Sequence, residues 1–419
     1  MYNFTIRNLS FNLKAAILTI GNELVSGFTI DTNSAWLGQK LLNYQIIVEK
    51  ISSVRDHNNS IKLELESLLS RKIQYLFITG GLGPTHDDIT REAIQQYFNL
   101  EEEFDQHYFN QLKDEFAQRG IEMSNSNRSQ AIIYKNCKML LNLKGTAKGI
   151  SFKHNKTNIF VLPGVPIEMK AIFNDSIIKD LHKSKFDKYI TLKSFGIAES
   201  NLADRLNPIL NKWDGLVEFA FLPSHKGVDL RLGYIEDSTI DLKKIKSEIF
   251  DNSGEYFYGI NNDKLESIIV KKMVQKKLTI AVAESCTGGQ LSNYITSVSG
   301  SSKIFLGGVI AYSNKLKVKF LGIDRYTLEK FGAVSQEIAI QMAQGIQAKT
   351  NAHIGIGITG ISGPTGGSDE KPVGLVYVAV LGLGVSKNKK FIIKMDRNMH
   401  QEMTAYIALN MVRRYYLEK

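Results

Sequence analysis

Short apolar runs alternate with longer periodic stretches through the first part of the chain. The runs at 15–21, 46–54 and 73–81 are rich in Ile, Leu, Val and Ala, as is typical of strands buried in a sheet. The stretches at 34–45 and 60–72 repeat apolar residues every three or four positions, as amphipathic helices do. Because helices that alternate with buried strands connect parallel strands, this region predicts an α/β domain with a mostly parallel sheet.

The pattern changes twice further along the chain. Between 189 and 250 it predicts a strand, a helix, two strands and a helix, which make a small α+β unit. A stretch rich in Gly, Asn and Tyr at 254–263 is typical of a linker. The last unit opens with a helix at 265–277 and returns to α/β alternation up to a closing helix at 401–416. We therefore predict three domains, at 1–172, 173–256 and 257–419.

Composition indicates a globular protein of a reducing compartment. The chain has 419 residues, 43% hydrophobic and 22% charged, enough for separate cores in two or three domains. No apolar run approaches the roughly 18 to 20 residues of a membrane span, and residues 1–14 lack the pattern of a signal peptide. The two cysteines, Cys137 and Cys286, show no C-x-x-C spacing, so neither a disulfide framework nor a zinc site is indicated. We expect a cytoplasmic protein.

The formal net charge of +10 raises the question of nucleic acid. The lysines are scattered, and the tightest group, 387–390, is short and has no interleaved aromatic residues. The charge pattern therefore does not favour nucleic-acid binding as the main role. A basic surface also suits a protein whose ligands are phosphorylated nucleotides, although a general bias toward lysine explains the charge equally well.

The densest chemical signal is the segment 283–289, Ala-Glu-Ser-Cys-Thr-Gly-Gly, between a predicted strand and a predicted helix. A serine at such a turn, Ser285, lies where glycines admit a ligand and where free amides at a helix N-terminus stabilise an anion. It is a candidate nucleophile. Two other interpretations stay open. Either Ser285 or Thr287 only caps the helix, or Cys286 is the nucleophile, although nothing beside it guarantees a thiolate.

A serine nucleophile needs a base. The last domain holds His353 and His400, neither in a recognisable triad context, so a lysine is the more interesting option. If a helix begins near Asn314, Lys317 lies about one turn in and points toward the Tyr312 hydroxyl and the serine turn. A lysine acts as a base only where burial lowers its pKa, and the alternative for it is an exposed surface charge.

A glycine-rich segment at 355–367 contains a formal G-x-G-x-x-G. The dinucleotide fingerprint requires a helix after the glycines, whereas here Gly363-Pro364 and Gly366-Gly367 continue a loop, so we reject a dinucleotide site. A glycine-rich loop that leaves a strand still wraps a phosphate with backbone amides, which is the functional interpretation we favour.

A second glycine-rich cluster, 79–90, follows a buried strand of the first domain. Its glycines free the backbone to wrap phosphates, and Asp87 or Asp88 is placed to hold a divalent cation. No Walker lysine is present, so an ATPase P-loop is excluded; the alternative is a turn with an aspartate cap. Because loops after successive strands gather at one sheet edge, we expect one ligand site there. Comparable clusters lie at 21–27, 31–33 and 163–168.

The C-terminal motifs together resemble the C-terminal domain of the CinA family. They are AESCTGG, GSS at 300–302, YSN with Lys317, TGISGPTGG followed by KPVG, and Asp396-Arg397, in order across nearly all of 260–419. The family is known for nicotinamide mononucleotide deamidase activity, which releases ammonia and leaves nicotinic acid mononucleotide. The resemblance implies Ser285 as nucleophile, Lys317 as base and Tyr312 as a proton-relay or positioning group, with no metal required.

The same resemblance implies a substrate site around the serine. Backbone amides near Cys286 to Gly288 hold the oxyanion, and Arg397 holds the substrate phosphate with its guanidinium fork. The chain departs from the family pattern at Gln401, where a second basic residue is expected, and at Ser362, where alanine is common. The first departure is expected to weaken phosphate binding and the second to be tolerated. The implied substrate-binding residues are Cys286, Thr287, Gly288, Ser302, Thr359, Gly360 and Arg397.

The N-terminal motifs resemble the family's N-terminal half, over about 13–172. That half is similar to molybdopterin-binding domains, and in some members it hydrolyses ADP-ribose to AMP and ribose 5-phosphate with a divalent metal ion, which we expect to be Mg, Mn or Co. Asp88 matches the motif aspartate and Asp56 is expected to join it as a metal ligand, whereas Asn22 departs from an expected aspartate. The implied substrate-binding residues are Glu23, Asp31, Asn33, Gly80, Gly81, Gly83, Thr85, Pro163, Gly164 and Glu168.

Taken together, the resemblance implies a homodimeric, bifunctional enzyme of pyridine-nucleotide salvage, with nicotinamide mononucleotide and ADP-ribose as substrates. Related N-terminal domains bind a pterin without cleaving a pyrophosphate, so the alternative for that domain is a non-catalytic nucleotide- or pterin-binding regulator. The middle unit resembles the family's KH-like module but lacks the G-x-x-G loop that clamps nucleic acid, which favours a spacer or dimerisation role. Only the family's name and the positive charge suggest a competence role at nucleic acid.

Overall fold

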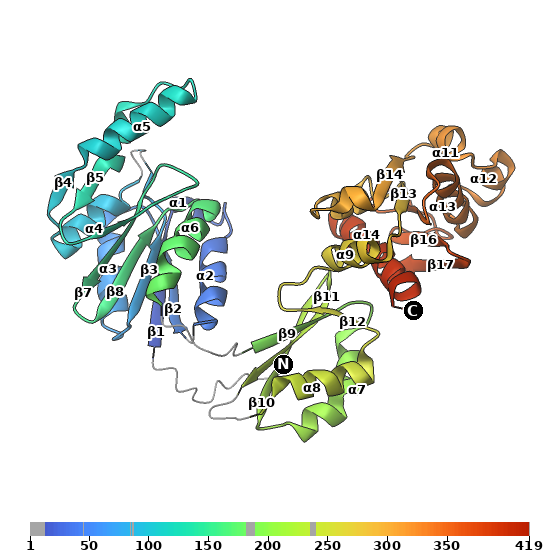
Figure 1. The fold of residues 1–419 in the computed structure, drawn as a ribbon, viewed down its shortest axis with the longest axis horizontal. Helices are drawn as coiled ribbons and strands as arrows, with labels where there is room; N and C mark the ends of the chain where they lie inside the picture. The colour runs from blue at the N-terminus through green and yellow to red at the C-terminus, as the bar shows by residue number, and fades with distance from the viewer. Residues whose placement is uncertain are drawn as a thin grey trace. The chain divides into compact units, whose positions relative to one another are not determined.

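The computed structural model describes residues 13–44, 46–83, 85, 88–181, 189–234 and 240–418. The chain separates between residues 188 and 189 into two compact units (Figure 1). In the described residues, the first unit holds one large sheet and a small two-stranded sheet, and the second unit holds two sheets. Asp87, one of the two aspartates singled out in the 79–90 cluster, lies outside the described residues.

A six-stranded sheet in the order β2-β1-β3-β8-β7-β6 forms the centre of the first unit. Its first four strands pair in parallel, as the apolar pattern predicted, and β7 and β6 pair antiparallel at one edge. The strands are β1 (Leu13–Ile20), β2 (Ile46–Val54), β3 (Tyr75–Thr79), β6 (Lys138–Leu140), β7 (Gly149–His154) and β8 (Thr157–Leu162).

Helices cover both faces of this sheet (Figure 1). Successive side chains of β1 enter two different cores: Leu18 packs with α3 and α4, whereas Ile17 packs with α2 and α6. This burial on both faces is why the central strands appear in the sequence as continuous apolar runs. The helices are α1 (Asn22–Val25), α2 (Thr32–Leu42), α3 (Asn58–Leu69), α4 (Thr90–Phe98) and α6 (Pro166–Ile172).

A small lobe of the first unit has a core of its own, built from Tyr108, Leu112 and Ala131. It consists of the antiparallel pair β4 (Glu102–Phe104) and β5 (Ile132–Tyr134), the helix α5 (Gln106–Gln118) and a 3-10 turn, Asn125–Ala131.

The first domain continues past the boundary expected at residue 172. A π-helical turn, Phe173–Ile177, and a 3-10 turn, Ile178–Asp180, extend α6. Phe173, Ile177 and Leu181 are buried in the same core as α2 and β1. Their apolar spacing continues that of the helix, so the packing of the first domain extends to Leu181.

An antiparallel sheet in the order β10-β11-β9-β12 opens the second unit, and α7 and α8 pack against it. The strand, helix, strand, strand, helix order matches the prediction. The last strand, β12, lies inside the expected linker 254–263 and pairs with β9, so this sheet continues past the boundary expected at 256. A four-residue strand gives too short a pattern to recognise. The elements are β9 (Tyr189–Ser194), α7 (Glu199–Lys212), β10 (Val217–Ser224), β11 (Gly227–Tyr234), α8 (Leu242–Ser253) and β12 (Phe257–Ile260).

The C-terminal sheet has the order β14-β13-β15-β16-β17. β14, β13 and β15 are parallel, and β16 and β17 are antiparallel to their neighbours. The strands are β13 (Ile280–Glu284), β14 (Phe305–Ile310), β15 (Ile354–Gly360), β16 (Leu375–Gly382) and β17 (Val385–Ile392).

Helices cover both faces of the C-terminal sheet as well. α9, α10 and α14 share one core, and α11 and α13 pack on the other face. The α/β class predicted for this domain is confirmed. None of the helices within the described residues combines the length and the apolar character that crossing a membrane requires. The helices are α9 (Leu265–Lys276), α10 (Gln290–Thr296), α11 (Asn314–Leu321), α12 (Arg325–Phe331), α13 (Gln336–Thr350) and α14 (Arg397–Val412).

Candidate functional sites

The candidate site of the C-terminal domain lies where three parallel strands end. Ser285 follows β13, Ala311 follows β14 and Ile361 follows β15. Because the three strands are parallel neighbours, the segments that leave them meet at one edge of the sheet. The serine turn, the segment that leads into α11 and the glycine-rich loop are therefore brought together.

Lys317 is buried beside Ser285. The helix α11 begins at Asn314, capped by the Ser313 side chain, and places Lys317 one turn in, with 1% of its surface exposed. Its Nζ lies 3.0 Å from Ser285 Oγ and 2.8 Å from the carbonyl oxygen of Ala311. A third contact, at 3.3 Å, is to the carbonyl oxygen of Tyr312.

These contacts suit a neutral amine. A backbone carbonyl only accepts hydrogen bonds, so the Ala311 and Tyr312 oxygens take two amine hydrogens of Lys317. The nitrogen lone pair of a neutral amine then faces the Ser285 hydroxyl. Burial lowers the pKa of Lys317, which favours the neutral form. The arrangement is chemically able to remove a proton from Ser285.

A buried carboxylate that sequence reasoning missed, Glu284, holds the serine turn in shape. Its oxygens accept the backbone amides of Gly289 and Leu291, both at 3.1 Å, and of Ser292 at 2.8 Å. The Ser292 hydroxyl adds a fourth bond at 2.6 Å. The residue is fully buried. An acidic residue between a strand and a helix N-terminus is the signal that points to this role.

The helix after the turn is not capped by Ser285 or Thr287. Its N-cap is Gly289, with a φ of 101°, and the first-turn amides are bonded to Glu284 instead. The interpretation of the two hydroxyl residues as simple caps is therefore wrong. Within the described residues, the backbone amides of Cys286 and Thr287 donate to no protein acceptor, so they remain available to an oxyanion.

Cys286 is a poor alternative nucleophile. Its thiol is buried, and burial raises its pKa to about 12. The thiolate, which is the reactive form, is therefore scarce at neutral pH. The Thr287 hydroxyl is buried too, and it has no hydrogen-bond partner in the described part of the chain.

Arg397 and Tyr312 form a hydrogen-bonded pair next to the segment that Lys317 contacts. Arg397 Nη2 donates to the Tyr312 hydroxyl at 3.1 Å, and Nη1 donates to the Gly363 carbonyl at 2.8 Å. Tyr312 is 61% exposed. The expectation that Lys317 points toward the Tyr312 hydroxyl is wrong. Lys317 contacts the backbone carbonyl of Tyr312 instead, because the tyrosine hydroxyl is bonded to Arg397.

Two other expected site residues lie differently. Thr359 is buried and donates its hydroxyl to the carbonyl of Ala333 at 2.7 Å. Ser302 lies before the first residue of β14, whereas Ser285 lies beside the last residue of that strand. The two serines are therefore separated by the length of a six-residue strand, about 20 Å. Ser302 is thus not part of the serine site in this chain. Gly360 ends β15, where a side chain would meet the Leu375 carbonyl at 2.7 Å.

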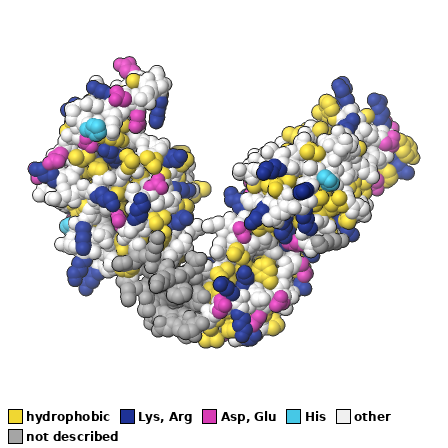
Figure 2. Space-filling view, in the orientation of Figure 1, with side chains coloured by type: hydrophobic (Ala, Val, Ile, Leu, Met, Phe, Trp, Pro, Cys, Tyr) yellow, Lys and Arg dark blue, Asp and Glu magenta, His cyan; other side chains and the backbone are white. Residues whose placement is uncertain are grey.

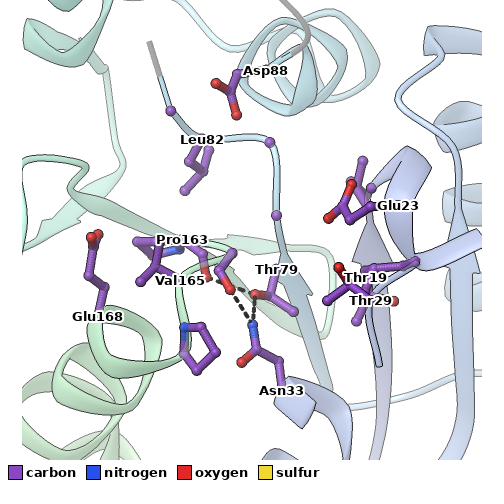
Figure 3. Close-up of a pocket in the computed structure, with 18 of the residues that line it drawn as sticks. Thr19, Glu23, Thr29, Asn33, Thr79, Leu82, Asp88, Pro163, Val165 and Glu168 are labelled. Atoms are coloured by element: carbon purple, nitrogen blue, oxygen red, sulfur yellow. Dashed lines mark hydrogen bonds between the residues drawn. The ribbon is translucent and has the colours of Figure 1, made fainter. Parts of the chain in front are cut away.

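The first domain has a cavity of about 500 Å³ at the carboxyl ends of its parallel strands (Figure 3). The loops after β1, β2, β3 and β8 line it, as expected from the clustering of motifs. Gly80 is required there because a side chain would meet the carbonyl of Ile20 at 2.0 Å. The predicted residues that line the cavity are Glu23, Asp31, Asn33, Asp56, Gly80, Gly81, Gly83, Asp88, Pro163, Gly164 and Glu168.

Thr85 is the one predicted residue of this set that does not line the cavity. Its amide donates to Asp88 Oδ2 at 2.9 Å, and its hydroxyl donates to the same oxygen. Thr85 therefore orients Asp88. The cavity also takes in Gln130 and Thr146, which sequence reasoning missed because they belong to long connections with no motif.

The floor of the cavity is a short hydrogen-bond network. Asn33 Nδ2 donates to Thr79 Oγ1 at 3.0 Å and to the Gly164 carbonyl at 2.8 Å, and Thr79 donates to the Pro163 carbonyl at 2.8 Å (Figure 3). The Asn33 side-chain oxygen is buried and has no hydrogen-bond partner within the described residues. It is an acceptor that a ligand donor would satisfy.

The described lining of this cavity is acidic. It has no lysine, arginine or histidine, but it has five carboxylates: Glu23, Asp31, Asp56, Asp88 and Glu168. Four of them have structural partners: Asp31 caps α2, Asp56 accepts the Asn22 amide at 2.8 Å, Glu168 accepts from Asn142 at 2.6 Å, and Asp88 accepts from Thr85. Over the described ranges, no three His, Cys, Asp or Glu side chains come together as a metal-binding group.

On the face shown in Figure 2, the Lys and Arg side chains of the described residues are spread among acidic and apolar ones and form no stripe. In the KH-like unit, the β10–β11 turn instead packs on α14: His225 Nε2 lies 2.9 Å and Lys226 Nζ 3.1 Å from the same Glu402 oxygen. This turn is therefore engaged with the C-terminal domain.

Three successive parts of the chain match three protein families. Residues 16–183 match the family described as "Probable molybdopterin binding domain", residues 190–259 match the damage-inducible protein CinA KH domain, and residues 262–416 match the CinA C-terminal domain. The three matches follow the order expected from the sequence.

Similar proteins span the whole chain. A CinA-like protein of Thermotoga sp. (strain RQ2) is 38% identical over 404 residues, 96% of this chain and 98% of the relative. A protein of Caldicellulosiruptor saccharolyticus, named as competence-damage inducible, is 37% identical over 96% of this chain and 99% of its own length. The solved competence/damage inducible protein CihA from Agrobacterium tumefaciens is 34% identical, covering 36% of this chain and 94% of its own, with a TM-score of 0.34. The chain therefore belongs to the CinA family.

Proposed function

We propose that the C-terminal domain is an amidase that hydrolyses the carboxamide of nicotinamide mononucleotide to nicotinic acid mononucleotide and ammonia. The observation that carries the proposal is the contact between the buried Lys317 amine and Ser285 Oγ. The free amides of Cys286 and Thr287 support it, since acyl transfer needs donors for the oxyanion. Arg397, which donates to the Tyr312 hydroxyl, is a cation that suits the substrate phosphate.

The residues define a two-step reaction. Neutral Lys317 takes the Ser285 proton as Oγ attacks the carboxamide carbon, and the turn amides hold the oxyanion. The protonated amine then passes this proton to the departing ammonia, which leaves an ester on Ser285. In the second step Lys317 takes a proton from water, the hydroxide cleaves the ester, and the amine returns the proton to Ser285.

Ammonia release from nicotinamide mononucleotide tests this proposal. Wild type is expected to turn over, whereas Ser285→Ala and Lys317→Met are expected to lose about a thousandfold or more of kcat. Lys315→Met is the matched control, because Lys315 is an exposed lysine on the same helix. A folded wild type without turnover rejects this substrate, and an active Lys317→Met variant rejects the lysine base.

For the N-terminal domain we propose metal-dependent hydrolysis of ADP-ribose to AMP and ribose 5-phosphate. The support is the acidic lining of its cavity: a bare pyrophosphate is repelled by five carboxylates with no described cation among them. A divalent ion such as Mg, Mn or Co removes this conflict, because it neutralises phosphate charge and needs only one or two protein carboxylates. Asp88 and Asp56 would hold it, with Thr85 orienting Asp88.

ADP-ribose cleavage with and without a chelator tests the N-terminal proposal. Asp88→Asn and Asp56→Asn are expected to reduce cleavage at saturating metal, whereas Asp175→Asn, an exposed aspartate outside the cavity, is expected to leave it unchanged. The competing function is a non-catalytic nucleotide- or pterin-binding regulator. Tight binding of ADP-ribose without AMP formation would decide for that function.

We also propose that the enzyme works in the cytoplasm as a homodimer, with the KH-like unit as spacer or dimerisation element. Its β10–β11 turn is occupied by the contact with Glu402, which supports a structural role over a nucleic-acid one. Sedimentation equilibrium of the full chain checks the dimer. If the protein bound DNA with an affinity that falls steeply as the salt concentration rises, a nucleic-acid role would be favoured instead.

A further inference from the structure

Two side chains lie within hydrogen-bond distance of the backbone carbonyl oxygen of Cys286, the residue after Ser285. Gln401 Nε2, from the beginning of α14, lies 2.8 Å from Cys286 O. Ser362 Oγ, from the loop after β15, lies 3.3 Å from the same oxygen. These are the two positions at which the C-terminal domain departs from the family pattern, so the resemblance supplies no role for the glutamine or the serine found here.

The direction of one free amide depends on this carbonyl. The Cys286–Thr287 peptide is trans, and in a trans peptide the carbonyl oxygen and the next amide hydrogen point in opposite directions. Holding Cys286 O therefore sets the direction of the Thr287 N–H. That amide donates to no acceptor in the described part of the chain. It lies in the turn that follows Ser285, where the oxyanion of the proposed reaction forms.

Gln401 makes the stronger hydrogen bond to the Cys286 carbonyl, because Ser362 has a second partner. Ser362 Oγ lies 2.9 Å from His400 Nδ1, and His400 Nε2 lies 3.2 Å from the Gly374 carbonyl, which only accepts. His400 therefore carries its proton on Nε2 and accepts at Nδ1. The single Ser362 hydroxyl proton is drawn to this closer acceptor, which leaves Gln401 as the main donor to Cys286 O.

We propose that Gln401 is a positioning residue of the C-terminal site, which aims the Thr287 amide at the oxyanion by holding the Cys286 carbonyl. The inference rests on the proposed amidase function. It differs from the role suggested by the family's basic residue at this position: a phosphate contact acts on KM, whereas an aimed oxyanion donor acts on kcat.

The test uses the full chain and three variants. Gln401→Met keeps the length of the side chain and removes the donor, and Gln401→Lys restores a donor. Gln336→Met is the matched control, since Gln336 is exposed at the start of α13. Two rates are measured: ammonia release from nicotinamide mononucleotide, and labelling of Ser285 by a fluorophosphonate probe, whose phosphonyl oxygen needs the same oxyanion donors but carries no nucleotide phosphate.

Gln401→Met is expected to lower both kcat and the labelling rate roughly tenfold, less than the ~100-fold or greater loss from deleting an oxyanion donor itself. KM should stay within about twofold, Gln401→Lys should recover most of both rates, and the thermal midpoint should hold. Unchanged rates in Gln401→Met, or a rise in KM alone, would overturn the inference.

The two readouts also separate this inference from the proposed function. Slower labelling of Gln401→Met, together with a wild type that releases no ammonia, would uphold the positioning role and reject nicotinamide mononucleotide as substrate. A folded wild type that neither labels nor turns over would overturn both, because Ser285 would then not be an activated nucleophile.

Discussion

Lys317 Nζ lies 3.0 Å from Ser285 Oγ, although 32 positions separate the two residues in the chain. They meet because β13 and β14 are parallel neighbours, so the turn after one strand and the helix after the other share an edge of the sheet. An exposed lysine is solvated and charged, whereas this one is buried and its pKa is lowered. In the proposed reaction Ser285 is the nucleophile and Lys317 its base, and these roles lead to the predictions below.

Deamidation should depend on pH through Lys317. Burial lowers its pKa below the ordinary value of 10.5, so the neutral amine is populated at a lower pH than in an exposed lysine. Because the neutral amine is the base, kcat should rise with pH through the pKa of the folded state and then level off. A kcat that is independent of pH below that plateau would contradict the assignment.

Stability should depend on pH through the same group. The folded state has the lower pKa, so between the folded and unfolded pKa values it binds fewer protons than the unfolded state. The contribution of Lys317 to the free energy of unfolding therefore rises with pH across that window. Urea unfolding at several pH values should show a shallower rise for Lys317→Met than for wild type. Lys315→Met, which removes an exposed lysine, should keep the wild-type slope.

Glu284→Gln should damage both stability and catalysis. The carboxylate accepts three backbone amides and the Ser292 hydroxyl, whereas a glutamine presents an NH₂ group to donors. We expect a loss of about 3 kcal/mol in the free energy of unfolding, measured by urea denaturation, and a lower kcat in the folded fraction. Glu329→Gln, which changes an exposed glutamate on α12, serves as the control. Equal stability of Glu284→Gln and wild type would show that the turn does not depend on this carboxylate.

Cys286 should be dispensable for chemistry. Burial raises the pKa of its thiol to about 12, so thiol reagents at neutral pH should leave activity intact. Cys286→Ala should keep kcat within about threefold, with a modest loss of stability from the missing sulfur. If this substitution abolished activity in a protein that still unfolds cooperatively, the result would favour Cys286 as the nucleophile.

Arg397→Ala should weaken binding of the substrate phosphate and spare the chemistry. Charge-assisted bonds from a guanidinium to phosphate are strong, so KM for nicotinamide mononucleotide should rise about tenfold or more while kcat changes little. Nicotinamide riboside, which lacks the phosphate, should be processed equally by Arg397→Ala and wild type. An exposed cation from the same region, Lys394→Ala, provides the comparison. Equal losses on both substrates would place Arg397 elsewhere in the mechanism.

Local sequence patterns predicted most helices and strands, because the side chains that an element buries are apolar and recur at the period of that element. The apolar run of β1, buried on both faces, and the helix that begins at Asn314 are both visible in the order of residues. The clustering of the N-terminal motifs at one sheet edge also followed from strand order. Short or irregular segments left no such record: β12 spans four residues, and the turns after α6 continue a helix without a new signal.

Sequence alone determined the family, the α/β class and the residue types available for chemistry, since these depend on local pattern and on motifs. Tertiary structure decided which residues meet. In the fold, Ser302 lies at the opposite end of β14 from Ser285, and the Tyr312 hydroxyl contacts Arg397. Gln401 contacts Cys286, although 115 positions separate them in the chain. Such contacts depend on strand order and side-chain direction, and no local pattern encodes either.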